Sequence, residues 1–221
     1  MIFYENAFRF KLNKICILKF DIMTLYNLYS QSYIMDNKGR LDLIIGPMYS
    51  GKSTHLIGAI YRYESIGKNV MCINHNIDNR YGTNVISSHN MLQRKCISTE
   101  KLLSIFQNTD YINSHIVVIE EGQFFTDLLH FVERAVDIDK KHVIVAGLSG
   151  DFKRRPFGQI LDLVPIADSI EKLTAFCKLC NDGTFAHFSK RIIAPCDTTT
   201  DPILVGTSDI YLPVCRFHYL N

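Results

Sequence analysis

The chain has 221 residues, of which 47% are hydrophobic and 21% are charged, and its formal net charge is +2. This length and composition allow one sizeable buried core, in one domain or in one domain with a small appendage. The near balance of charge argues against a protein that binds nucleic acid or an anionic membrane through a charged surface.

The cysteine pattern indicates metal binding rather than a disulfide framework. The chain has seven cysteines, an odd number, and includes the spacing Cys177-x-x-Cys180. A chain of this length does not need covalent staples, so a reducing compartment is favoured. No apolar run reaches the roughly 18 residues of a membrane span, and the N-terminus lacks the unbroken apolar centre of a signal peptide. We therefore expect a soluble, cytoplasmic protein.

The first 40 residues do not share the pattern of the rest and end in the polar stretch SQSYIMDNKGR. We interpret residues 1–40 as an extension of unknown order. Met35 lies six residues before the first predicted strand, so it is a candidate for the functional start.

From Leu41 onward, predicted strands alternate with predicted helices. The strands are apolar throughout rather than alternating, which is typical of a parallel sheet covered on both faces. The predicted class is therefore α/β, with a three-layer core built on a parallel sheet. The predicted strands span 41–46, 69–74, 116–121 and 142–148, and the predicted helices span 52–67, 99–106 with Thr99 as its cap, and 125–137.

Two other stretches differ in character. Residues 75–95 are polar and rich in turn residues. After about residue 170 the paired cysteines appear, and no long helix fits the polar stretch that follows them. We therefore divide the chain into an α/β domain over 41–170 and a small second domain over 171–221.

The stretch GPMYSGKS matches the phosphate-binding pattern G-x-x-x-x-G-K-[ST] through Gly46, Gly51, Lys52 and Ser53. The glycines let backbone N–H groups point at phosphate oxygens, and the following helix offers the positive end of its dipole. Lys52 is expected to reach the β- and γ-phosphates, and the Ser53 hydroxyl to ligate Mg²⁺. A strand before the loop and a helix after it favour this interpretation over an ordinary glycine-rich turn. The three-layer core is therefore predicted to be like that of the P-loop nucleoside triphosphatases.

Two adjacent acids, Glu120 and Glu121, end the predicted strand over 116–121. A P-loop protein needs an acid at the end of a neighbouring strand to position Mg²⁺. Strand alternation would point the two side chains apart unless the chain turns, and Gly122 favours a turn. One acid then serves the metal and the other acts as base for an acceptor hydroxyl. The alternative is a solvated strand end.

The second pair, Cys215-x-x-His218, complements Cys177-x-x-Cys180. Three thiolates and one imidazole suit tetrahedral Zn²⁺, and four protein donors make a closed, structural site. The alternative is that Cys215 and His218 are unrelated residues.

Together these motifs resemble those of the type II thymidine kinases, a family that includes the cellular cytosolic enzyme and its poxvirus counterparts. The resemblance runs from about Leu41 to Tyr219, in the family's order. A lone P-loop identifies no family, whereas this ordered series is specific. Its stretches are GPMYSGKST (46–54), DNRY (78–81), EEGQFF (120–125), GLSGDFKRRPFGQILDLVPIAD (147–168), KLTAFCKLC (172–180), FSKR (188–191) and YLPVCRFHY (211–219).

The resemblance implies transfer of the γ-phosphate of ATP to the 5′-hydroxyl of thymidine, and of deoxyuridine, for nucleotide salvage. It implies Mg²⁺ with ATP, a structural Zn²⁺, a homotetramer and dTTP as feedback inhibitor. Glu121 matches the general base that takes the proton from the 5′-hydroxyl. The residues implied at the ATP phosphates are Gly46, Pro47, Met48, Tyr49, Ser50, Gly51, Lys52, Ser53, Asp78, Asn79, Arg80, Glu120, Glu121, Gly122 and Gln123.

The resemblance also implies how the nucleoside binds. Phe152 matches the aromatic residue that packs on the thymine ring, and Met48 lies near the 5-methyl group. The stretch 202–206 matches a lasso loop that reads the base largely through backbone groups, with the zinc tethering its two ends. The implied substrate residues are Met48, Phe124, Leu148, Phe152, Phe157, Ser189, Pro202, Ile203, Leu204, Val205, Gly206 and Tyr211, and the implied zinc ligands are Cys177, Cys180, Cys215 and His218.

The chain departs from the family's pattern at four positions. Glu120 stands where Asp is usual, which keeps the charge but shifts the carboxylate. His218 stands where Cys is usual, and Ser189 replaces the more usual Thr. Pro202 has no N–H group to offer to a base.

Two rival functions are weighed against this one. A nucleotide-gated nucleic-acid binder with a zinc ribbon would need a basic stripe on the ribbon. Residues 177–219 instead balance Lys178, Lys190, Arg191 and Arg216 against Asp182, Asp197, Asp201 and Asp209. A catalytically impaired member of the family is the second rival, with Glu120 as its only hint.

Overall fold

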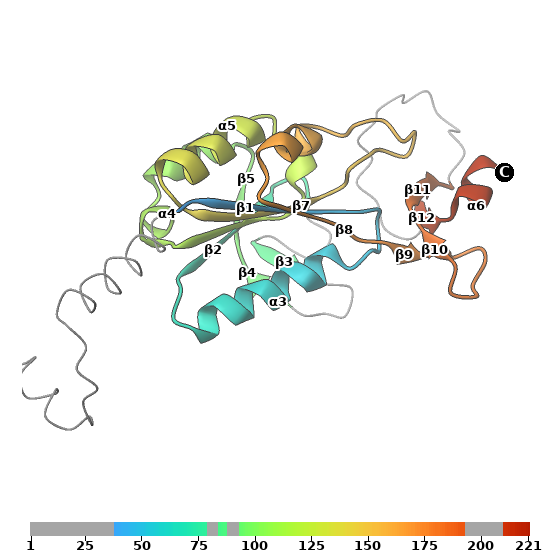
Figure 1. Cartoon of the computed structure of the whole chain (residues 1–221), viewed down its shortest axis with the longest axis horizontal. Coiled ribbons are helices and arrows are strands. Elements are labelled where there is room, and N and C mark those ends of the chain that lie inside the picture. The colour runs from blue at the N-terminus through green and yellow to red at the C-terminus, as the bar shows by residue number, and fades with distance from the viewer. Residues whose placement is uncertain (1–37, 79–83, 88–92, 193–209) are drawn as a thin grey trace, which may run out of the picture. The chain divides into compact units, whose positions relative to one another are not determined.

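We analysed a computed structural model of the chain, which describes residues 38–78, 84–87, 93–192 and 210–221 (Figure 1). The chain divides into two units, Met1–Lys38 and Gly39–Asn221, and the elements described below belong to the second. The predicted N-terminal extension, with Met35, lies outside the described residues apart from residues 38–40. Among the described residues, no helix is long and apolar enough to cross a membrane.

A six-stranded sheet in which every strand pair is parallel forms the centre of this unit. The strand order is β5-β2-β6-β7-β1-β8. This arrangement confirms the predicted α/β class. The strands are β1 (Arg40–Ile45), β2 (Val70–His75), β5 (Ile97–Thr99), β6 (Ile116–Ile119), β7 (His142–Gly147) and β8 (Ser169–Lys172).

The side chains of the strands feed two separate apolar cores, one on each face of the sheet. Leu43 of β1 packs into a core with Phe131 of α5 (Leu128–Glu133). Its neighbour Ile44 packs into the opposite core with Leu56 of α3 (Lys52–Ser65). Figure 1 shows α3 below the sheet and α4 (Thr109–Asn113) and α5 above it. The three predicted layers are therefore present, and continuous apolar strands are required because both faces are covered.

The predicted helix over 99–106 is wrong in its type and in its start. The structure has a 3-10 helix, η1 (Leu102–Gln107), and Thr99 ends strand β5 instead of capping a helix. Thr99 pairs with His75 in the sheet, so its backbone is extended. Its hydroxyl accepts a hydrogen bond from the Lys101 N–H at 3.3 Å, which bridges the strand to the helix.

The predicted helix over 125–137 begins later than expected. Helix α5 starts at Leu128 and continues after Glu133 as a π-helical segment, η3 (Arg134–Ile138). The preceding Asp127 is held by another element, because its carboxylate accepts a hydrogen bond from the Leu103 N–H at 3.0 Å.

The turn-rich stretch 75–95 contains a hairpin that the sequence did not predict. Strands β3 (Val85–Ser87) and β4 (Gln93–Lys95) pair antiparallel beside α3. Arg94 of β4 forms an ion pair with Glu64 in the last turn of α3, and Ile86 of β3 is buried against the same helix. The hairpin thus depends on contacts distant in sequence.

A small C-terminal lobe follows the sheet; we use this name for residues 174–192 and 210–221. Its own apolar cluster contains Ala175, Cys177, Ala186, Val214 and Cys215. The main sheet itself reaches Lys172, two residues into the stretch assigned from sequence to the second domain. The elements of the lobe are β9 (Ala175–Phe176), β10 (Phe185–Ala186), β11 (Phe188–Arg191), β12 (Tyr211–Val214) and α6 (Arg216–Leu220). The 3-10 helix η4 (Ile160–Ile166) precedes β8 and packs into the core of the main sheet.

Phe131 provides a test of the core above the sheet. Its side chain is fully buried, and its ring stacks on Phe106 with 4.9 Å between centroids. We expect Phe131→Ala to lower the free energy of unfolding by about 3–5 kcal/mol, because it leaves a cavity that the core cannot refill. Ile138→Ala, at a side chain that is 72% exposed, should change it by less than about 0.5 kcal/mol. Urea denaturation measures both values, and equal losses would contradict this packing.

Candidate active site

The phosphate loop of residues 46–53 joins β1 to α3 at the carboxyl edge of the sheet. Tyr49 and Gly51 both have left-handed backbones, with φ of 64° and 84°. At Gly46 a Cβ atom would lie 2.6 Å from the Ser50 hydroxyl oxygen and 2.8 Å from the Leu173 carbonyl oxygen. Only glycine therefore fits at this position. The 14-residue helix α3 starts from this loop, so its positive dipole end faces the place where an anion would bind.

Lys52 lies folded over this loop. Its ammonium group donates hydrogen bonds to the carbonyl oxygens of Gly46, at 3.3 Å, and Pro47, at 2.9 Å. The positive charge is thus held at the mouth of the loop that the sequence assigned to phosphate.

Glu120 follows β6 directly and is only 6% exposed. One of its carboxylate oxygens accepts a hydrogen bond from the Ser53 hydroxyl, and the other, Oε2, has no hydrogen-bond partner among the described residues. Burial, and then the charge of Glu121, raise the pKa of Glu120 to about 8. A buried oxygen without a partner, next to a hydroxyl, is a donor set that suits Mg²⁺, which prefers oxygen ligands. Ser53 and Glu120 therefore fit the ion.

The chain turns sharply at Glu121, which has a left-handed backbone with φ 52° and ψ 40°. This turn separates the two adjacent carboxylates. The Gln123 amide nitrogen donates to Glu121 Oε2 at 2.5 Å, and the Gln123 amide oxygen accepts from the Leu148 N–H at 2.9 Å. Through these two hydrogen bonds Gln123 holds the Glu121 carboxylate near the end of β7. Gln123 is only 3% exposed, so water competes little for either bond.

The position of Gln123 depends on a close approach by Gly158. A Cβ atom at Gly158 would lie 2.0 Å from the Gln123 carbonyl oxygen, and Gly158 has a φ of +56°. Both facts require glycine there. The same approach brings Phe157 against Phe124, edge to face, with 5.5 Å between ring centroids. Two of the four aromatic residues assigned to the nucleoside are therefore neighbours.

Two further assigned residues, Asp78 and Ser189, lie close to the phosphate loop or to Glu120. Asp78 follows β2, accepts a hydrogen bond from the Asn74 side chain at 3.4 Å, and adds to the field that raises the pKa of Glu120. The Ser189 hydroxyl of β11 accepts a hydrogen bond from the Met48 N–H at 3.0 Å, which ties the phosphate loop to the C-terminal lobe. Seven assigned residues lie outside the described part of the chain, namely Asn79, Arg80, Pro202, Ile203, Leu204, Val205 and Gly206.

Phe152 and Tyr211 lie near each other on the side of the C-terminal lobe. Their ring centroids are 6.5 Å apart, and the guanidinium of Arg191 lies 5.5 Å from the Phe152 ring. Phe152 thus belongs to an aromatic and cationic group that the spacing of the sequence did not reveal.

The four predicted zinc donors converge in the C-terminal lobe, where their ligand atoms lie within 4.8 Å of one another. His218 Nδ1 lies 3.5 Å from Cys177 Sγ, 3.3 Å from Cys180 Sγ and 3.4 Å from Cys215 Sγ, and the Cys180 and Cys215 sulfurs are 3.8 Å apart. A tetrahedral Zn²⁺ requires about 3.8 Å between sulfurs and about 3.6 Å between sulfur and nitrogen. This group could therefore hold zinc.

The electrostatics of Cys177 also suit a metal ligand. Burial raises the pKa of its thiol, but hydrogen bonds from the backbones of Cys215, Cys180 and Leu179 outweigh that effect and lower the pKa to about 6. The thiolate is the form of cysteine that binds zinc, and this thiol is already stabilised in it.

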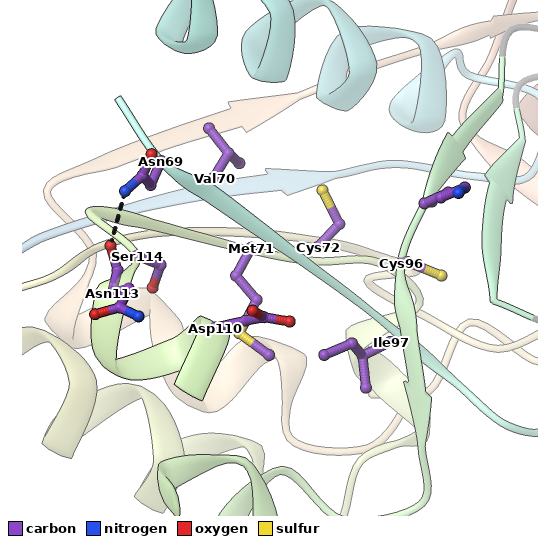
Figure 2. A pocket seen from close by; sticks show the side chains of 10 residues that line it. Asn69, Val70, Met71, Cys72, Cys96, Ile97, Asp110, Asn113 and Ser114 are labelled. Atoms are coloured by element: carbon purple, nitrogen blue, oxygen red, sulfur yellow. Dashed lines mark hydrogen bonds between the residues drawn. The ribbon is translucent and has the colours of Figure 1, made fainter. Parts of the chain in front are cut away.

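A separate cavity of about 340 Å³ lies away from these residues, beside the first half of β2 (Figure 2). Strand β5 pairs with β2 only from Ile73 onward, so the space beside Val70, Met71 and Cys72 is not filled by a strand. None of the assigned site residues lines this cavity.

Comparison with known proteins decides the family. The sequence model described as thymidine kinase matches residues 39–219. The chain belongs to the thymidine kinase family. Thymidine kinase a of Arabidopsis thaliana is 41% identical over 186 residues, which cover 83% of this chain and 76% of that protein. The thymidine kinase of Oryza sativa subsp. japonica is 42% identical over 83% of this chain and 67% of its own length. The thymidine kinase of Monkeypox virus is 40% identical over 84% of this chain and 99% of its own length.

Within this thymidine kinase family member, sequence reasoning missed two contacts. The pattern assigned Gln123 to the phosphates, and the structure places its side chain between Glu121 and Leu148. Tyr219 had no assigned role, although its hydroxyl donates to the Phe152 carbonyl oxygen at 2.8 Å. The position of Tyr219 beside His218, a predicted zinc donor, was the only available signal.

The raised pKa of Glu120 predicts a pH dependence of stability. The contribution of the protonated Glu120 is fully present below about pH 4.5, its ordinary pKa, and is lost as the pH rises to about 8. In buffer without divalent cations, Glu120→Gln should therefore lose less thermal stability than the wild type between pH 5 and pH 8. Melting temperatures across this range measure the effect. The exposed Glu133→Gln is the control, and parallel curves for Glu120→Gln and the wild type would refute the pKa shift.

The convergence of Cys177, Cys180, Cys215 and His218 predicts that the protein binds one metal ion through these four residues. The purified protein should contain about one Zn²⁺ per chain, and Cys180→Ser should lose most of it, because three donors hold zinc less tightly than four. Cys72→Ala removes a buried cysteine outside the cluster and should keep the metal. Elemental analysis of the three proteins checks this, and equal zinc contents in both variants would exclude the assigned ligand set.

Proposed function

We propose that this protein transfers the γ-phosphoryl group of ATP to the 5′-hydroxyl of thymidine, giving ADP and dTMP. Family membership supports the reaction, and one observation carries it. The left-handed turn at Glu121 directs one acid to Ser53 of the phosphate loop and leaves the next on Gln123. A phosphoryl-transfer site needs these two roles, a metal-positioning acid and a base for the acceptor.

The phosphate side of the reaction rests on residues 46–53. Backbone N–H groups of the loop, the N-terminus of α3 and the Lys52 ammonium would stabilise the negative charge of the transferred group. Ser53 and Glu120 would hold Mg²⁺, which when bound neutralises charge on the β- and γ-phosphates. Little covalent chemistry is required of the protein, since positioning and electrostatics supply most of the rate.

The acceptor side rests on Glu121. Its carboxylate takes the proton of the 5′-hydroxyl while the 5′-oxygen attacks the γ-phosphorus and the bond to ADP breaks. Gln123 fixes the direction of this carboxylate through its amide, whose other end is held by the Leu148 N–H. The base is thus positioned before the substrates arrive.

The nucleoside would lie between two groups of apolar residues. Phe152 is the proposed stacking partner of the thymine ring, with Tyr211 beside it, and Phe124, Leu148 and Phe157 form the opposite wall. Met48 is proposed near the 5-methyl group. Deoxyuridine is a second expected acceptor, since it differs from thymidine by that methyl group alone.

The proposals on zinc, the lasso, the oligomeric state and regulation rest on membership of the thymidine kinase family. A structural Zn²⁺ would hold the C-terminal lobe, in which the lasso residues 202–206 are proposed to close over the base. A homotetramer and inhibition by dTTP are expected. The cytoplasm is the proposed place of action, because the thiols of the metal cluster must stay reduced. The alternative of a catalytically impaired or nucleic-acid-binding protein is not favoured, because proteins named thymidine kinases match over most of the chain.

Glu121→Gln tests the assignment of the base. The variant should bind ATP as the wild type does, while kcat for thymidine falls by about 10²- to 10⁴-fold, because the amide cannot take the proton. A thymidine phosphorylation assay with and without Mg·ATP measures kcat, and a nucleotide-binding assay measures the affinity for ATP. The exposed Glu133→Gln should leave both unchanged. Full turnover by Glu121→Gln would refute the role of this residue.

A further inference from the structure

The loop that carries Phe152 is folded back on itself immediately after that residue. The Asp151 carboxylate accepts hydrogen bonds from the N–H groups of Lys153 and Arg155, each at 2.8 Å. The Asp151 N–H in turn donates to the Arg155 carbonyl oxygen at 2.9 Å. Arg154, at the bend, has a left-handed backbone with φ 62°. The turn is well defined within itself, but these bonds do not fix it to the rest of the protein.

Helix α6 of the C-terminal lobe supplies that attachment. The Tyr219 hydroxyl donates a hydrogen bond to the Phe152 carbonyl oxygen at 2.8 Å. The Arg154 guanidinium lies 4.4 Å from the centroid of the Tyr219 ring, and the Tyr219 ring lies 5.3 Å from that of Phe188. One side chain therefore contacts the Phe152 loop twice, through its hydroxyl and through its ring face.

The same helix is anchored at the metal cluster. His218, the residue before Tyr219, offers its ring to the cluster, and its carbonyl oxygen accepts a hydrogen bond from the Lys190 ammonium at 2.7 Å. The Tyr219 N–H donates to the carbonyl oxygen of Cys215, another donor of the cluster, at 3.0 Å. The orientation of Tyr219 is thus set by the residues that would bind zinc.

We infer that Tyr219 is a positioning residue for nucleoside recognition, which holds the Phe152 loop to the helix of the metal ligand His218. The inference rests on the proposed function, in which the Phe152 ring stacks on the thymine. Through this contact a metal held by the four donors would act on the acceptor site by fixing helix α6. Without the hydroxyl, the loop would sample other positions. Only the position in which Phe152 can stack on thymine binds the nucleoside, so the apparent affinity for thymidine would fall.

Tyr219→Phe is the sharpest test, because it keeps the ring, and with it the contacts to Arg154 and Phe188, and removes the hydroxyl alone. A hydrogen bond of this kind corresponds to about a two- to tenfold change in an equilibrium constant. We expect the Kd and KM for thymidine to rise by about that factor. The KM for ATP, the kcat at saturating thymidine and the zinc content should stay as in the wild type.

Tyr111→Phe is the matched control. Tyr111 lies on helix α4, away from the assigned site, and its hydroxyl donates a hydrogen bond to Asp139 at 2.7 Å. The variant therefore also removes one tyrosine hydroxyl that donates a hydrogen bond. Its loss should cost a similar amount of stability and leave the affinity for thymidine unchanged.

NMR relaxation of the backbone without ligand gives a readout that does not depend on the proposed function, because it reports movement of the whole loop even where the hydrogen bonds within the turn stay closed. The order parameters of the Lys153 and Arg155 N–H groups should be lower in Tyr219→Phe than in the wild type, and Tyr111→Phe should match the wild type.

Unchanged order parameters, or unchanged affinity in an enzyme that binds thymidine, would overturn the inference. Loss of zinc from Tyr219→Phe would also overturn it, because the hydroxyl would then act on the metal cluster. If the wild type itself binds no thymidine, the proposed function fails, while lower order parameters would still support the attachment of the loop.

Discussion

Two adjacent carboxylates held by different partners are the constraint on which the candidate site depends. Glu120 and Glu121 follow the same strand, and side by side in a regular strand they would point to opposite faces of the sheet. The left-handed backbone at Glu121 lets both stay at the edge of the sheet and still face different partners. A non-glycine residue pays conformational energy for this backbone, and such strain is found where function requires it.

The rest of the site compensates for placing two like charges so close together. Burial and the neighbouring charge both disfavour ionisation of Glu120, and the Ser53 hydroxyl offsets only part of this. A bound cation would restore the ionised form, which links occupancy of the phosphate loop to the charge of the strand end. Glu121 is stabilised in another way, through Gln123, which reaches the next strand of the sheet. Each carboxylate therefore has its own support, and the two supports come from different elements.

The sequence predicts those parts of the fold whose signals are local. The apolar runs of β1, β6 and β7 and the glycines of residues 46–53 are visible within a few residues, and they place the phosphate loop at the correct edge of the sheet. Two roles could be predicted for the adjacent acids only if the chain turns between them. The φ angle of Glu121 that makes this turn cannot be predicted from local sequence, because it depends on packing against neighbouring elements. The spacing of Cys177, Cys180, Cys215 and His218 was enough to predict that these four side chains come together.

Contacts between distant side chains could not be predicted in this way. The three-residue strands β3 and β4 have little periodicity, and they depend on Arg94 meeting Glu64 of α3. Thr99 looks like a helix cap in sequence, yet pairing with β2 keeps it in a strand. Gln123 and Tyr219 acquire their roles from partners that are 25 and 67 positions away in the chain.

The hydrogen bond between Ser189 and Met48 limits how this position can vary in evolution. The N–H group of Met48 belongs to the phosphate loop, and its acceptor is a hydroxyl on β11 of another lobe. Exchange between Ser and Thr preserves that acceptor, whereas Ala or Val would leave the N–H without it. Serine therefore keeps the acceptor that threonine would offer to the loop. Residue 189 is expected to vary only among side chains that can accept this hydrogen bond, a requirement separate from any contact with substrate.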